Sequence, residues 1–72
     1  MKNNLAYWRK ERMYSQRSLG EAVGVQAQTI ANYETARHRP RIDTLRKIVE
    51  VLGVPAEQLF EDDEQPASLI AS

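Results

Sequence analysis

The chain has 72 residues and no cysteine, which allows one domain and excludes disulfides and thiolate metal sites. No apolar run approaches the roughly 20 residues of a membrane helix, and the charged start predicts no signal peptide, so we expect a cytoplasmic domain. The net charge is zero, but residues 1–47 carry +6 and residues 48–72 carry −6, which predicts a basic surface for a polyanion and an acidic tail.

Capping and helix-breaking residues divide the chain into five predicted helices. Ser15 is a favourable N-cap for the second helix, and Tyr14 and Leu19 flank it at the spacing of a hydrophobic staple. Gly24 and Gly53 are expected to end the second and fourth helices, since glycine adopts the left-handed conformation without strain. The predicted helices cover about residues 4–12, 16–23, 27–36, 42–52 and 56–60, so the fold class is all-α.

Apolar residues recur at intervals of three and four within these segments, and this pattern predicts the buried helix faces. It assigns Ala22 to the buried face of the second helix and Ile42 to the apolar stripe of the fourth. Residues 61–72 are acidic and aperiodic, so we expect a disordered tail there and a domain covering residues 1–60.

Residues 16–35 have the pattern of a helix-turn-helix, in which two helices meet through a turn of three or four residues. A small residue is needed where the two helices approach, and Gly20 occupies that position. The turn needs a residue with positive φ, and Gly24 follows four positions later. Apolar residues flank both glycines and are expected to fix both helices to the core.

The pattern extends over most of the chain and resembles the Cro/repressor, or Xre, helix-turn-helix family. It begins with Ser15-Gln16-x-x-Leu19-Gly20-x-x-Val23-Gly24-Val25-x-x-x-Thr29-Ile30-x-x-Tyr33-Glu34 and resumes at Arg39-Pro40-Arg41-Ile42-Asp43-Thr44-Leu45. The resemblance covers residues 4–60 and implies a compact five-helix bundle of the lambda-repressor-like type. It further implies a cytoplasmic, nucleoid-associated regulator of prokaryotic or phage type. We expect a repressor that binds a pseudo-palindromic operator as a homodimer.

In this family the third helix lies in the major groove, with its N-terminal residues on base edges. The matching positions predict base contacts from Gln26, Ala27, Gln28, Thr29 and Asn32. The amides of Gln28 and Asn32 offer a donor and an acceptor together, which suits adenine. The alternative is that these amides form only a solvated helix face and contact no base.

The resemblance also implies phosphate and minor-groove contacts. They are assigned to the start of the second helix and to the loop after the third, and the residues are Gln16, Arg17, Ser18, Arg37, Arg39 and Arg41. Arginines at alternate positions would point the same way if the loop were extended. Two positions depart from the family pattern, because Gln26 and Arg41 stand where small capping residues are usual.

Two further sets of residues are given roles in stability and assembly. The resemblance implies a partly buried structural ion pair between Arg9 and Glu34, which orients the third helix. Apolar residues in excess of a single stripe predict a homodimer interface; they are Val51, Val54, Leu59 and Phe60.

DNA binding has two alternatives, an enzyme and a protein-interaction module. An enzyme is disfavoured because the chain has one histidine, no cysteine and no glycine-rich phosphate loop. A protein-interaction module with the same fold remains open, with Leu69 and Ile70 of the acidic tail 61–72 available to dock on a protein partner. No cofactor or metal is expected.

Overall fold

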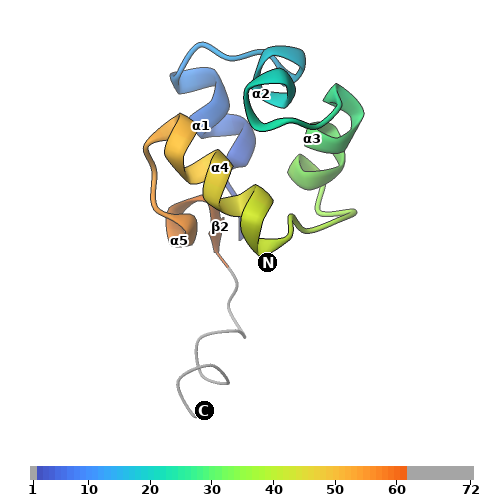
Figure 1. Ribbon diagram of the computed structural model, residues 1–72. Coiled ribbons are helices and arrows are strands. Elements are labelled where there is room, and N and C mark those ends of the chain that lie inside the picture. Colours follow the sequence, from blue (N-terminus) through green and yellow to red (C-terminus); the bar gives the residue numbers. More distant parts are fainter. Residues whose placement is uncertain (1, 62–72) are drawn as a thin grey trace.

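The computed structural model describes residues 2–61 and contains the five expected helices. The helices are α1 (Leu5–Glu11), α2 (Gln16–Val23), α3 (Ala27–Glu34), α4 (Ile42–Leu52) and α5 (Ala56–Leu59). Figure 1 shows α2 and α3 together on one side of the bundle, away from α5. The predicted bounds agree to within about two residues, and the largest difference is at the end of α3, which stops two residues before Ala36.

All five helices contribute to one hydrophobic core. Its fully enclosed side chains come from every helix and are Leu5, Leu19, Ile30, Ile48, Leu52 and Leu59. Two predictions about buried faces are wrong, because Ala22 is exposed and Ile42 is 64 % exposed. Ile42 is the first residue of α4, and its side chain borders an open apolar hollow beside Leu45 and Ala56 instead of entering the core.

The chain also contains a short antiparallel ladder that the sequence did not predict. Strand β1 (Lys2–Asn3) pairs with strand β2 (Phe60–Glu61), with Lys2 opposite Glu61 and Asn3 opposite Phe60. Glu61 was expected to begin the disordered tail, but it forms part of this ladder. The ladder therefore closes the bundle by joining the two ends of the domain, and residues 62–72 of the predicted tail lie outside the described residues.

Backbone geometry at the helix ends explains where most of the helices stop. Gly24 and Gly53 have φ of 85° and 69°, so each ends its helix in the left-handed conformation as predicted. Met13 and Ala36 also have positive φ, at 66° and 64°.

The Arg12 side chain donates from Nε to the Leu52 carbonyl (2.8 Å), which satisfies a free carbonyl at the end of α4 and fastens α1 to it.

No helix within residues 2–61 has both the length and the apolar character needed to cross a membrane.

Candidate nucleic-acid interface

The turn between α2 and α3 is built on Gly20. The N–H groups of Gly24 and Val25 both donate to the Gly20 carbonyl at 2.8 Å, which folds the turn back onto α2. A Cβ atom at Gly20 would lie 2.5 Å from the Val25 carbonyl oxygen, closer than any side chain allows. The glycine is therefore required by close approach of the turn backbone, rather than by contact with the third helix.

The start of α2 is fixed by a reciprocal pair of serines. Ser15 accepts at Oγ from the Ser18 N–H (2.9 Å), and Ser18 accepts at Oγ from the Ser15 N–H (2.8 Å). This is a capping box, in which two free donors of the helix terminus are satisfied together. The sequence indicated the Ser15 cap but not the box, because its third helical position usually holds Glu or Gln. Ser18 thus has a structural role at a position predicted to contact phosphate.

The predicted base-contacting residues all lie at the N-terminal part of α3. Gln26 and Gln28 are exposed, whereas Ala27, Thr29 and Asn32 are half-buried. Gln26 occupies the N-cap position without a side-chain capping bond, as its departure from the family pattern suggested. The side chain of Gln26 is therefore not committed to the helix terminus.

Gln28 and Asn32 form a pair of amides on the exposed side of α3. Gln28 donates from Nε2 to Asn32 Oδ1 at 3.2 Å, one helical turn away. Among the described residues, no hydrogen bond occupies Gln28 Oε1 or Asn32 Nδ2. The pair therefore presents an acceptor and a donor side by side, which matches the N6 and N7 edge of adenine.

A buried polar network anchors the other end of α3. Arg9 on α1 donates from Nε to Glu34 Oε2 at 2.5 Å, and both side chains are only 9 % exposed. The same guanidinium donates to the Tyr14 carbonyl at 2.8 Å, so it also holds the loop before α2. Gln16 on α2 donates from Nε2 to Glu34 Oε1 at 3.0 Å. One carboxylate thus joins α1, α2 and α3.

Gln16 was predicted to contact phosphate, and the network shows what positions it. Its side chain is half-buried and held by Glu34, while its neighbour Arg17 is exposed and pairs with Glu21 at 3.4 Å. The start of α2 thus offers one fixed amide and one exposed cation. Sequence reasoning missed the bond between Gln16 and Glu34, since it joins residues 18 positions apart without a recognisable spacing.

The loop after α3 carries three exposed arginines: Arg37, Arg39 and Arg41. It is not extended throughout, because Ala36 is left-handed and the N–H groups of Arg37 and His38 return to the Asn32 carbonyl (2.9 and 3.3 Å). The expectation that all three side chains point the same way therefore loses its basis at Arg37. Arg41 is extended and stands at the N-cap of α4 without a side-chain capping bond.

Three of the residues predicted to form a dimer interface lie in the core of the single chain. Val54, Leu59 and Phe60 are 3 %, 0 % and 8 % exposed, and Val51 is half-buried against the same core. Their apolar character is therefore explained by folding of one copy, and it gives no indication of a dimer. Sequence alone could not separate the two explanations, because both require apolar side chains.

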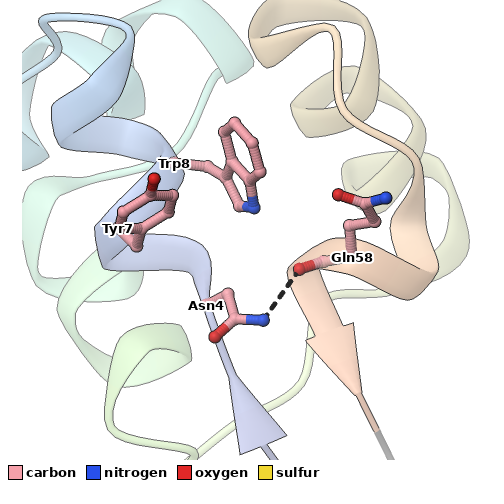
Figure 2. A pocket seen from close by; sticks show the side chains of 4 residues that line it. All are labelled: Asn4, Tyr7, Trp8 and Gln58. Carbon is pink, nitrogen blue, oxygen red and sulfur yellow. Dashed lines mark hydrogen bonds between the residues drawn. The ribbon is translucent and has the colours of Figure 1, made fainter.

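A separate hollow of about 520 Å³ lies between α1 and α5 and is lined by Asn4, Tyr7, Trp8 and Gln58. Asn4 donates from Nδ2 to the backbone carbonyl of Gln58 at 3.1 Å, a bond drawn as a dashed line in Figure 2. The rings of Tyr7 and Trp8 meet in a T-shaped arrangement, and the Arg12 guanidinium lies 5.1 Å from the centre of the Trp8 ring. The residues of this hollow all belong to the joint between α1 and α5, and none comes from α2 or α3.

Residues 2–61 contain no group of His, Asp or Glu that could hold a metal ion.

Comparison with known proteins agrees with this geometry. A helix-turn-helix family model matches residues 5–59. The chain is 35 % identical over 65 residues to YgzD of Bacillus subtilis (strain 168), described as an uncharacterized HTH-type transcriptional regulator, covering 90 % of this chain and 98 % of YgzD. It is 32 % identical over 56 residues to the cryptic phage CTXphi transcriptional repressor RstR of Vibrio cholerae, covering 78 % of this chain and 50 % of RstR.

Another relative is an uncharacterized HTH-type transcriptional regulator of Sinorhizobium medicae (strain WSM419). It is 40 % identical over 48 residues, which cover 67 % of this chain. The chain thus spans half of RstR and 34 % of the Sinorhizobium protein. The family match extends across all five helices, including the turn built on Gly20 and both ends of α3. The chain belongs to the Xre-type helix-turn-helix family of DNA-binding transcription regulators.

Proposed function

We propose that this chain binds a pseudo-palindromic duplex as a homodimer, with α3 in the major groove, and that it represses transcription. The observation that carries this proposal is the amide pair of Gln28 and Asn32. Two joined amides on the exposed side of a helix, with an acceptor and a donor that no other residue of 2–61 occupies, have the chemistry of a base-reading surface. Repression is supported by the relative RstR, whose name describes a transcriptional repressor.

Phosphate contacts are assigned to the start of α2 and to the arginine loop. Arg17, Arg37 and Arg41 are exposed, and the backbone N–H groups at the start of a helix favour a bound anion. Such contacts position the protein without reading sequence, whereas the α3 amides specify the site. Two copies would read half-sites about 34 Å apart, one turn of the duplex.

Binding to a random duplex at several salt concentrations tests the electrostatic part. The logarithm of the affinity should fall with the logarithm of salt concentration, with a slope of about −0.9 for each phosphate that is neutralised. Arg37→Gln and Arg41→Gln should each lower affinity for all duplexes and reduce the slope by about 1. Lys10→Gln, which removes an exposed charge from α1, is the matched control. Absence of duplex binding at low salt would favour the protein-interaction module instead.

Selection of bound sites from random DNA tests the base-reading part. Gln28→Ala should cost about 1–3 kcal/mol on the selected site and relax preference at one base pair. Gln58→Ala removes an exposed amide from α5 and should leave the preference unchanged. If Gln28→Ala weakened every duplex alike, Gln28 would be a phosphate contact and the assignment of α3 would be wrong.

A further inference from the structure

The outward face of α4 carries an apolar hollow of about 270 Å³ that is separate from the α3 surface. Ile42, Leu45 and Val49 line it at intervals of three and four, together with Ala56, the first residue of α5. Ile42 is 64 % exposed, whereas the other branched aliphatic side chains of residues 2–61 are buried or half-buried. Apolar surface that gathers in a hollow, instead of being scattered singly, is typical of a surface that binds something.

The chain itself stays close to this hollow as far as the end of β2. Ala56 lines the hollow, and only the rest of α5 and β2 separate it from Glu61. One turn of helix followed by two extended residues spans at most about 13 Å. The segment 62–72, which lies outside the described residues, therefore begins near the hollow.

That segment has a composition complementary to the hollow. Its only branched aliphatic residues are Leu69 and Ile70, and they follow the acidic stretch 62–64. Arg46 borders the hollow, is exposed and forms no ion pair or hydrogen bond with any other residue of 2–61. Glu50 also borders the hollow, so the acidic stretch is expected on the side of Arg46.

We infer that Leu69 and Ile70 cover the α4 hollow of their own molecule. Residues 62–69 lead from β2 to this apolar pair, and a flexible linker of that length has a root-mean-square span of about 16 Å, with a limit of about 26 Å when fully extended. The span matches the distance of about 13 Å to Ala56, which gives the pair an effective concentration of the order of millimolar at the hollow. A second copy or another protein would need a comparable concentration to displace it. The segment thus acts as an intramolecular cover for this face of α4.

Paramagnetic relaxation in the full chain tests the inference without DNA. The chain has no cysteine, so Ser72→Cys places a nitroxide label at one defined position beyond the apolar pair. The label should broaden the amide signals of Leu45 and Val49 in the chain that carries it. An isotope-labelled chain without nitroxide, mixed with a nitroxide-labelled chain, should show no broadening, because the contact lies within one molecule.

Variants of both sides test whether the apolar pair makes the contact. In the nitroxide-labelled chain, Leu69→Ser combined with Ile70→Ser should remove the broadening. Ile42→Ser alters an exposed residue of the hollow, leaves the core intact and should weaken it. Gln65→Ser combined with Ala71→Ser is the matched control, since it changes the same number of residues in the segment and should retain the broadening.

Three results would overturn the inference: no broadening in the nitroxide-labelled chain, broadening that persists without Leu69 and Ile70, or broadening that passes between molecules in the mixture. The last result would assign the hollow to a second copy. The inference goes beyond the proposed function and does not depend on it, because the experiment contains no duplex and alters no residue of α2 or α3. A failure here leaves DNA binding standing, and a failure of DNA binding leaves the cover standing.

Discussion

Two arginine–glutamate pairs in this molecule have the same chemistry and different surroundings. Arg9 and Glu34 are joined at 2.5 Å between α1 and α3, and both side chains are 9 % exposed. Arg17 and Glu21 are joined at 3.4 Å along α2, with side chains 84 % and 69 % exposed. The first pair connects residues 25 positions apart, whereas the second lies within one helical turn.

The difference separates a structural pair from one whose arginine remains available to a ligand. Water screens the charges of an exposed pair, so it contributes little to stability. A buried pair has lost its water, and each charge depends on the other and on further hydrogen bonds. Arg9 has such a bond to the Tyr14 carbonyl, and Glu34 has one from Gln16. The buried pair therefore determines how α3 sits on α1 and α2.

The largest expected effect comes from removing one partner of the buried pair. Glu34→Ala leaves the Arg9 guanidinium buried without its counter-ion and should lower the free energy of unfolding by about 3–5 kcal/mol. Urea denaturation followed by circular dichroism measures this loss. A loss below about 1 kcal/mol would show that water reaches the pair, contrary to its burial.

Replacing both partners should restore much of that loss. Arg9→Met combined with Glu34→Leu removes both charges together, and such exchanges are often neutral. A double-mutant cycle should therefore give a coupling of about 2 kcal/mol or more for this pair. The same cycle with Arg17→Ala and Glu21→Ala should give less than about 0.5 kcal/mol, which makes the exposed pair the matched control. Equal couplings would contradict the comparison.

Substitution of Gln16 should have an intermediate effect on stability, because Gln16 bonds to Glu34 of the buried pair and lies next to Arg17 of the exposed pair. Gln16→Ala removes one hydrogen bond from Glu34 and should lower the free energy of unfolding by about 1 kcal/mol. If the amide also contacts phosphate, affinity should fall alike for all duplexes, which titration of a selected and a random site would measure. A change in site preference alone would instead place Gln16 on a base.

Local features of the fold were accessible from the sequence because short-range chemistry determines them. Gly24 and Gly53 end their helices, and Ser15 caps α2, for reasons that involve only a few neighbouring residues. The pairing of Arg9 with Glu34 came from family resemblance, since no local rule joins residues on different helices. The helix-turn-helix could thus be placed before the structure was known.

The remaining features depend on contacts between distant parts of the chain. The β1–β2 ladder has two-residue strands, too short for any alternating pattern, and it pairs Asn3 with Phe60. Periodicity placed Ile42 on the apolar stripe of α4, and an excess of apolar residues placed Phe60 at an interface, but the structure exposes the first and buries the second. An apolar side chain shows that it avoids water, and only the tertiary structure shows what covers it.

The smallest effect on stability is expected at the exposed pair, where function and stability separate. Arg17→Ala should change the free energy of unfolding by less than about 0.5 kcal/mol, because the pair is screened by water. The same substitution should reduce the slope of duplex affinity against salt by about 1 if Arg17 neutralises a phosphate. Glu21→Ala frees Arg17 from its partner and should leave that slope unchanged. An unaltered slope in Arg17→Ala would confine the phosphate contacts at this end of the surface to Gln16 and the backbone of α2.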